Sequence, residues 1–391
     1  MNATAVRSFP HAESRGARSP FASRSRRLGS TLGMAGLILL PSALPAGEAT
    51  PASALPVRGI HFSAPGKRDL PATLEFIRTA LATNGVNTLI IEFNYRYDFQ
   101  SRPEFADPSA LDRADAQQLL AACRASGIEL IPMINCLGHQ SWAARNDRLL
   151  QLHPEFDETP GKYPENQDIY CRSYCPRHPE VHGVLFDLMD ELVRDCEAKA
   201  FHVGMDEVFL LADPDCPRCA GQAPAELFAE EVGRLRDHLA GRGCRLWVWG
   251  DRFLDGRATG LGRWEASEND TQAAIDRVPK DIVICDWHYD AAPETAAHFA
   301  RKGFDVVSCP WRKPAVALEQ LALMRALRQD DDPEVARRAR GMVQTTWCGL
   351  EAFRRAYADL AGGAPIQQNS AYESANCFRE LFRAMPPRTA D

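Results

Sequence analysis

Short apolar runs alternate with amphipathic stretches along the chain from residue 57 onward. The runs are almost continuously apolar, which is typical of strands covered on both faces, as in a parallel sheet. We expect strands at residues 57–64, 86–95, 128–139, 199–208, 244–253, 281–289, 304–311 and 341–349.

The stretches between these runs have the spacing of amphipathic helices. In the first, apolar residues recur every three or four positions from Leu70 to Leu81, and Gly85 follows as a stop signal. We expect helices at 70–85, 113–126, 178–197, 224–243, 271–278, 292–302, 315–328 and 350–384. Strands that each precede a helix predict an α/β fold, a (β/α)8 TIM barrel. An open doubly wound sheet is the alternative, but no glycine-rich phosphate loop follows the first strand.

The first residues of the chain resemble an export signal. Arg24, Arg26 and Arg27 precede an apolar stretch at 28–40, and small residues follow up to Ala46. We therefore predict a signal peptide or N-terminal extension at 1–46, a catalytic domain at 57–385, a periplasmic or secreted location and no membrane span in the mature chain. Two export pathways stay open, the general secretory (Sec) pathway and the twin-arginine pathway. A net charge of −7 argues against nucleic acid as a partner.

Two adjacent acids, Asp206 and Glu207, interrupt the apolar sequence FHVGMDEVFLL at 201–211. Burying two like charges together is costly unless something uses or compensates them. Trp249, Trp287 and Trp347 stand at the ends of later strands. Carboxylates surrounded by indoles favour a sugar site, because pyranose CH faces stack on aromatic rings while hydroxyls need polar partners.

The motif HVGMDEV at 202–208 resembles the His-x-Gly-x-Asp-Glu signature of glycoside hydrolase family 20, the β-N-acetylhexosaminidases, and is similar to its compact single-barrel branch. VRGIHF on the first strand resembles the family's Arg-Gly start, and PMINCLGHQ on the third resembles its Pro-Glu-Ile-Asp-x-x-Gly-His. There are departures: Met133 and Asn135 stand where the family has Glu and Asp, and the eighth strand ends TTWCG instead of Leu-Trp-Thr-Glu.

The resemblance implies an exo-acting enzyme that removes terminal GlcNAc or GalNAc from glycans or cell-wall fragments, without a cofactor or a catalytic metal. In the substrate-assisted mechanism it implies, Asp206 orients the substrate's 2-acetamido group and Glu207 is the general acid and base. The sugar-binding residues expected from the resemblance and from strand positions are Arg58, His139, His202, Trp249, Trp287, Tyr289 and Trp347.

The sequences CRSYC and CPRC place two cysteine pairs in the loops after the third and fourth strands, namely Cys171, Cys175, Cys216 and Cys219. They are candidates for a structural zinc site or for disulfides, or they are unrelated. Three other functions stay open. One is a non-catalytic carbohydrate-binding barrel, and another is a zinc-dependent hydrolase built on these loops. The third is a barrel glycosidase with separated carboxylates drawn from Glu92, Asp251 or Asp286.

Overall fold

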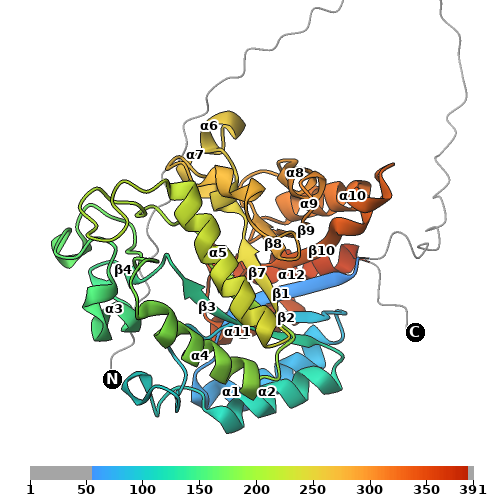
Figure 1. Cartoon of the computed structure of the whole chain (residues 1–391). Helices are drawn as coiled ribbons and strands as arrows, with labels where there is room; N and C mark the ends of the chain where they lie inside the picture. The colour runs from blue at the N-terminus through green and yellow to red at the C-terminus, as the bar shows by residue number, and fades with distance from the viewer. Residues whose placement is uncertain (1–54, 386–391) are drawn as a thin grey trace, which may run out of the picture. The chain divides into compact units, whose positions relative to one another are not determined.

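The computed structural model describes residues 55–385, and in it eight parallel strands close into a barrel (Figure 1). The strands, in their order around the barrel, are β1 (Val57–Ser63), β2 (Thr88–Glu92), β3 (Glu129–Cys136), β6 (Ala200–Gly204), β7 (Arg245–Trp249), β8 (Val283–Trp287), β9 (Asp305–Cys309) and β10 (Ala339–Gln344). Each predicted run overlaps one of them, although β10 begins two residues before its run, so the predicted (β/α)8 TIM barrel is confirmed. The segment predicted as a signal peptide, 1–46, lies outside the described residues.

Helices connect the strands and surround the barrel (Figure 1). They are α1 (Leu70–Phe76), α2 (Arg113–Ala125), α3 (Arg148–Leu152), α4 (Val181–Asp195), α5 (Pro224–Gly241), α6 (Gly256–Thr259), α7 (Gly262–Glu265), α8 (Thr295–Arg301), α9 (Pro314–Leu327), α10 (Pro333–Arg338), α11 (Leu350–Ala361) and α12 (Ser370–Ala384). Side-chain hydrogen bonds to the main chain cap the starts of several of these helices. At α2, for example, the Asp112 side chain accepts from the Asp115 N–H, and the Asp115 side chain accepts from the Asp112 N–H in return.

Three predicted helices differ from the structure. The one expected at 70–85 is α1 followed by a π-helical segment, Ile77–Leu81. The one expected at 271–278 is a short 3-10 turn, Gln272–Asp276. The one expected at 350–384 is two helices, α11 and α12, because Gly362, Gly363 and Pro365 interrupt the helical sequence between them.

The core has two parts. Inside the barrel lies a small cluster that includes Trp247, Trp249 and Trp287, and a much larger cluster fills the layer between strands and helices. Successive residues of a strand face these two parts in turn. The direction of each side chain therefore decides whether it can reach the barrel's interior.

The connection after β3, residues 137–180, is the longest between a strand of the barrel and the helix layer that follows it. It holds a small hairpin of β4 (Ser141–Trp142) and β5 (Arg145–Asn146), followed by α3. It leaves the carboxyl end of its strand, the end at which TIM barrels build active sites. A hollow of about 550 Å³ at the opposite end is lined by Arg124, Arg245 and Arg340, among others.

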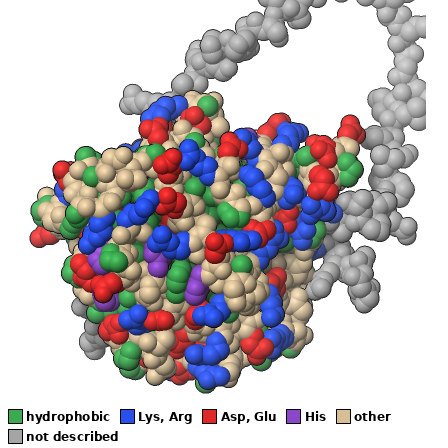
Figure 2. Space-filling view, viewed as in Figure 1, with side chains coloured by type: hydrophobic (Ala, Val, Ile, Leu, Met, Phe, Trp, Pro, Cys, Tyr) green, Lys and Arg blue, Asp and Glu red, His purple; other side chains and the backbone are tan. Residues whose placement is uncertain are grey.

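The surface is mixed in charge. Figure 2 shows Lys and Arg interspersed with Asp and Glu over the visible face, without a large area of one sign. No described helix combines the length and the apolar character needed to cross a bilayer.

Candidate active site

Asp206 and Glu207 follow β6 directly, at the carboxyl end of the barrel. The backbone there is strained: Met205 and Glu207 have φ of 68° and 48°, and His139 across the site has φ of 55°. L-residues rarely adopt this left-handed conformation, and it persists where surrounding structure enforces it, often at functional sites. The turn places the two neighbouring acids at the mouth of the barrel, with only small fractions of their side chains exposed.

His139, from the loop after β3, reaches both acids. Its Nε2 atom lies 3.3 Å from Oδ2 of Asp206 and 3.4 Å from Oε2 of Glu207. Burial acts to lower the pKa of His139, but the charge of Asp206 and the contacts with both carboxylates outweigh it and hold the pKa well above its ordinary value. The imidazolium therefore compensates the acid pair at neutral pH.

Asp251, after β7, supports Glu207 from behind. Its Oδ2 accepts the Glu207 main-chain N–H at 2.9 Å and the Arg252 Nε–H at 2.7 Å. Its Oδ1 accepts the indole N–H of Trp287 at 3.3 Å. Burial raises the pKa of Asp251 to about 6, with the charge of Asp206 adding to the rise and Arg252 opposing it. Asp251 is thus a positioning group with its oxygens already engaged.

Indole and imidazole rings form the inner wall of the site. Trp249 is fully buried, with ring centroids 4.4 Å from His202 and 6.1 Å from Trp347. Trp347 donates its indole N–H to the Tyr289 hydroxyl at 2.7 Å, and Tyr289 stacks obliquely on Trp287 at 4.9 Å. The predicted aromatic residues are therefore brought together around the acid pair.

Several buried polar atoms of this wall lack a partner within residues 55–385. They include Oδ1 of Asp206, Nε1 of Trp249 and Nε2 of His202. The His202 Nδ1 accepts the Gly204 N–H at 3.0 Å, and burial holds the pKa of His202 well below its ordinary value, so the neutral ring carries its hydrogen on Nε2. Unpaired buried donors and acceptors are costly. Two donors and one acceptor here are what a polar ligand would satisfy.

His61 and Glu92 are site residues that the sequence analysis did not assign to sugar binding. His61 Nε2 lies 3.6 Å from Glu92 Oε2, and the His61 ring contacts Trp347 at 4.9 Å. Glu92 also accepts from Asn135 at 2.9 Å and pairs in register with Met133 on the neighbouring strand. Family 20 has a Glu where this chain has Met133, and here the carboxylate of Glu92 lies beside that position on the neighbouring strand.

Arg58 does not reach this site. It stands near the start of β1, and its guanidinium donates to the main-chain oxygen of Asn84 at 2.8 Å and lies over the Phe382 ring of α12. These contacts belong to the layer between strands and helices. The expectation that Arg58 binds sugar hydroxyls is therefore corrected, because its side chain points out of the barrel.

Asp286, one of the separated carboxylates considered above, also faces the helix layer. Its oxygens accept from the Thr295 hydroxyl of α8 at 2.8 Å and lie 3.1 Å from His288. Glu92 and Asp251 are close to the acid pair, but their oxygens are held by the hydrogen bonds described above.

Aromatic residues outside the barrel form a rim beside the acids. Tyr170 makes edge-to-face contacts with His139, Trp142, Phe209 and Trp264, at centroid distances of 5.0 to 5.9 Å. Trp142 and Trp264 are partly exposed. Tyr170 and Trp142 come from the irregular connection after β3, where no periodic pattern could have placed them.

Three of the four cysteines predicted to meet do so in the structure. Cys175, Cys216 and Cys219 converge, but Cys171 lies apart, with its Sγ 3.7 Å from the main-chain oxygen of Glu207. Glu158 occupies the fourth position of the cluster instead. His139, Asp206 and Glu207 form a second group whose ligand atoms lie within 4.8 Å of one another and could hold a cation.

Comparison with known proteins agrees with this architecture. Residues 94–316 match the model of the glycosyl hydrolase family 20 catalytic domain. The fold is similar to that of the chitobiase of Flavobacterium johnsoniae, with 16% identity and a TM-score of 0.57 over 85% of this chain and 51% of that one. It is also similar to that of the exo-β-N-acetylglucosaminidase of Vibrio harveyi in complex with N-acetylglucosamine, with 16% identity and a TM-score of 0.54 over 86% and 59%.

This chain spans about half the length of the first of these structures. At such low identity the likeness extends to the fold alone. No curated protein sequence matches the chain.

Proposed function

This chain belongs to glycoside hydrolase family 20, and from that premise we propose that it is an exo-acting β-N-acetylhexosaminidase. Its substrates would be glycans or cell-wall fragments that end in GlcNAc or GalNAc. The observation that carries the proposal is the pair of adjacent acids, Asp206 and Glu207, at the mouth of the barrel beside unpaired donors.

Adjacent acids suit a mechanism in which the substrate supplies the nucleophile. A retaining enzyme with two catalytic carboxylates needs them about 5–5.5 Å apart on opposite sides of the anomeric carbon, whereas family 20 uses substrate assistance. The acetamido oxygen bonds to the anomeric carbon as the glycosidic bond breaks, and Glu207 gives its proton to the leaving oxygen. Water then attacks the same carbon and gives a proton to Glu207 while the bond from this carbon to the acetamido oxygen breaks. The two displacements together retain the configuration of the anomeric carbon, and the acetamide is regenerated.

Asp206 has the geometry to steer this reaction. Its Oδ1 is buried and without a partner in the described chain, so it is available to accept the acetamide N–H as positive charge develops there. Its Oδ2 is held near His139. The division of Asp206 into one anchored and one available oxygen supports its role as the amide-orienting group.

Kinetics on a chromogenic N-acetylglucosaminide test the proposal. We expect Glu207→Gln to lower kcat by roughly 10²–10⁴-fold, as for the loss of a general acid, and Asp206→Asn by roughly 10²–10³-fold. A thiazoline mimic of the cyclised intermediate should inhibit the wild type. The matched control is Glu226→Gln, an exposed acid paired with Arg277 on the outer surface, which should keep full activity.

Two results would contradict the proposal. A trapped ester between the sugar and Asp206 or Glu207 would rule out substrate assistance. Binding of the chromogenic N-acetylglucosaminide to the wild type without its hydrolysis would favour the non-catalytic carbohydrate-binding barrel.

We also propose export to the periplasm or medium, on the basis of the basic and apolar sequence at 24–46. N-terminal sequencing of the protein from its natural host tests this. Recovery of the intact N-terminus from the cytoplasm would contradict it.

A further inference from the structure

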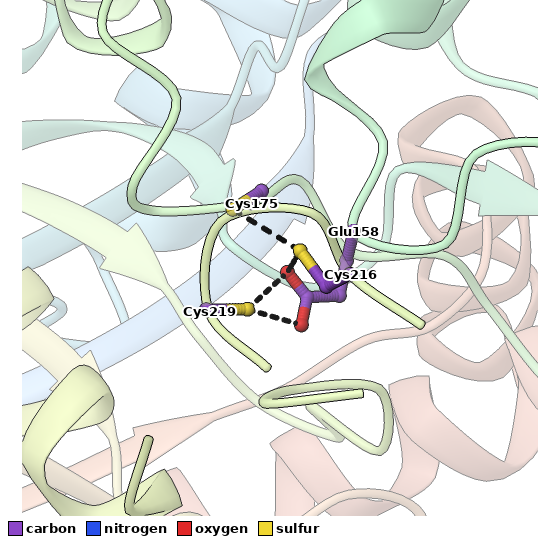
Figure 3. Close-up of side chains that lie close together, drawn as sticks. All are labelled: Glu158, Cys175, Cys216 and Cys219. Atoms are coloured by element: carbon purple, nitrogen blue, oxygen red, sulfur yellow. Dashed lines mark hydrogen bonds between the residues drawn. The ribbon is translucent and has the colours of Figure 1, made fainter. Parts of the chain in front are cut away.

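Three thiols and one carboxylate meet in a buried cluster beside the active-site loops (Figure 3). The Sγ atoms of Cys175 and Cys216 lie 3.6 Å apart. The Cys219 Sγ lies 2.7 Å and 3.0 Å from the two carboxylate oxygens of Glu158, and the Cys216 Sγ lies 3.3 Å from one of them. Each residue thus directs a potential metal ligand to a common point.

The spacing fits tetrahedral coordination. Zinc binds thiolate sulfur at about 2.3 Å and carboxylate oxygen at about 2.0–2.2 Å, so tetrahedral angles separate two sulfurs by roughly 3.7 Å and a sulfur from an oxygen by roughly 3.5 Å. The sulfur–sulfur distance of 3.6 Å between Cys175 and Cys216 is close to this. The Cys219–Glu158 contacts are shorter, and they need to open by less than an ångström to admit an ion.

The Glu158 carboxylate accepts the Asp213 main-chain N–H at 3.0 Å and hydrogen bonds from the thiols of Cys216 and Cys219, but it has no cationic side chain as a partner among the described residues. Glu158 is fully buried, and within residues 55–385 no Lys, Arg or His lies at ion-pair distance from it. The nearby Lys162 pairs with Asp213 and Asp215 instead. A buried carboxylate without a cation is costly, and direct coordination to a divalent metal would give it a cationic partner.

The backbone holds the ligands in place from two separate loops. Glu158 and Cys175 lie on adjacent extended segments joined by an Asp157–Tyr174 bridge, and Cys175 donates its N–H to the Phe156 oxygen at 2.7 Å. Cys216 and Cys219 are the ends of the sequence CPRC in the loop after β6, and C-x2-C is a common spacing in zinc sites. The ligand set is therefore built before any ion arrives.

We propose that Cys175, Cys216, Cys219 and Glu158 form a structural zinc site that fastens the loop after β3 to the loop after β6. On binding, the three thiols release their protons, and Zn²⁺ accepts three thiolates and one carboxylate oxygen without any change of oxidation state. Four protein ligands leave no open position, so the ion is structural and takes no part in catalysis. The site is independent of the proposed glycosidase activity.

Metal analysis of the purified full-length protein tests the site directly. We expect about one zinc per chain in the wild type after growth with added zinc, and at least a roughly tenfold lower content in Cys216→Ser. The matched control is Cys377→Ser, which alters a buried thiol of α12 outside the cluster and should retain the zinc. Replacing zinc by Co²⁺ should give a thiolate-to-cobalt charge-transfer band in the wild type and in Cys377→Ser.

A labelling experiment on the wild type avoids any folding defect of the variants. Alkylation of native protein followed by peptide mass spectrometry should show Cys175, Cys216 and Cys219 becoming reactive when a strong zinc chelator is added, while Cys196 stays protected by burial. Far-ultraviolet circular dichroism checks that the barrel remains folded.

Three outcomes would overturn the proposal. One is wild-type protein without zinc whose cluster thiols react equally with and without the chelator. Another is a mass two hydrogens lower with a disulfide mapped within Cys175, Cys216 and Cys219, which is the alternative favoured by an oxidising compartment. The last is zinc that persists in Cys216→Ser but is lost in His139→Gln, since it would place the ion at the acid pair.

Discussion

The imidazole Nε2 atom of His139 lies 3.3 Å from Oδ2 of Asp206, although the two residues come from loops after different strands. The same nitrogen lies 3.4 Å from Glu207. One imidazole ring therefore contacts both neighbouring carboxyl groups in a largely buried site. This arrangement makes both the stability and the activity of the protein depend on the protonation of a single ring.

Replacing His139 tests that dependence. The folded-state pKa of His139 is raised, so its stabilising contribution is fully present below the unfolded pKa of about 6.5 and is lost as pH rises through the folded value. We expect His139→Gln to lower the free energy of unfolding by about 1–3 kcal/mol near pH 6. The difference from wild type should shrink at alkaline pH. Urea unfolding at several pH values measures it, and an equal difference at all pH values would contradict the assignment.

The strand junction beneath the acids depends on Gly204. Its φ is +68°, and a Cβ placed there would lie 2.2 Å from Oδ1 and 2.9 Å from Cα of Asn135. Gly204→Ala should therefore destabilise the protein by about 2 kcal/mol or more and displace Asn135 from Glu92. The melting temperature measured by thermal unfolding and kcat/KM should both be lower than in the wild type.

Gly233 provides the opposite control. It lies within α5, and a Cβ there would meet nothing within 4 Å. Gly233→Ala should stabilise the protein by about 0.5–1 kcal/mol without a change in activity. If Gly204→Ala and Gly233→Ala changed the free energy of unfolding equally, the close contact between Gly204 and Asn135 would not restrict the residue at position 204.

We predict that the Tyr289 hydroxyl donates a hydrogen bond to the acetamide oxygen of the substrate. It accepts from Trp347 at 2.7 Å and from Thr345 at 3.5 Å, which leaves its own hydrogen to donate. Burial raises its pKa well above the ordinary value, so it stays protonated at working pH. Tyr289→Phe should lower kcat/KM by roughly 10²-fold, as for the loss of one donor to the reacting oxygen.

The matched control is Tyr372→Phe, which removes a surface hydroxyl bonded to Asp359 between α11 and α12. Its kcat/KM should equal that of the wild type. If Tyr289→Phe were equally active, Tyr289 would be a packing residue and the acetamide oxygen would need another donor.

The sequence predicted the strands well because a parallel sheet buried on both faces leaves continuous apolar runs, which are easy to recognise. The acid pair was equally recognisable, since Asp206 and Glu207 interrupt such a run. Arg58 was assigned to the wrong face, although the signal was present. In a strand, Arg58 and His61 point to opposite faces, and only His61 contacts the ring of Trp249.

Residues in the irregular connection after β3 could not be placed from sequence. Tyr170 and Glu158 lie in a segment without helical or strand periodicity, where tertiary hydrogen bonds set the course of the chain. Their contacts with His139 and with the cysteines depend on how that segment folds back, and no local pattern encodes this. The sequence therefore does not identify Glu158 as a member of the cysteine cluster, and Cys171 is wrongly predicted to belong to it.

Arg172 organises this connection. Its side chain is buried, and the guanidinium donates to the side chains of Asp157 and Asn166 and to the main-chain oxygens of Lys162 and Tyr163. Within the segment it spans, four non-glycine residues have left-handed φ values of 52° to 63°, namely Tyr163, Glu165, Asn166 and Asp168. Each such residue costs of order 1 kcal/mol or more, so the segment needs an anchor.

We expect Arg172→Ala to release this segment rather than unfold the barrel. Cleavage by a nonspecific protease should accelerate roughly tenfold or more between residues 157 and 170, because local opening governs proteolysis of a loop. The control, Arg145→Ala, alters an exposed arginine of β5 in the same connection and should leave the cleavage pattern unchanged. Because Tyr170 lies in the released segment, Arg172→Ala should also displace it from the aromatic rim and weaken the binding of longer glycans. Unfolding of the whole variant, with no preferred cleavage in the segment, would instead show that Arg172 supports the barrel itself.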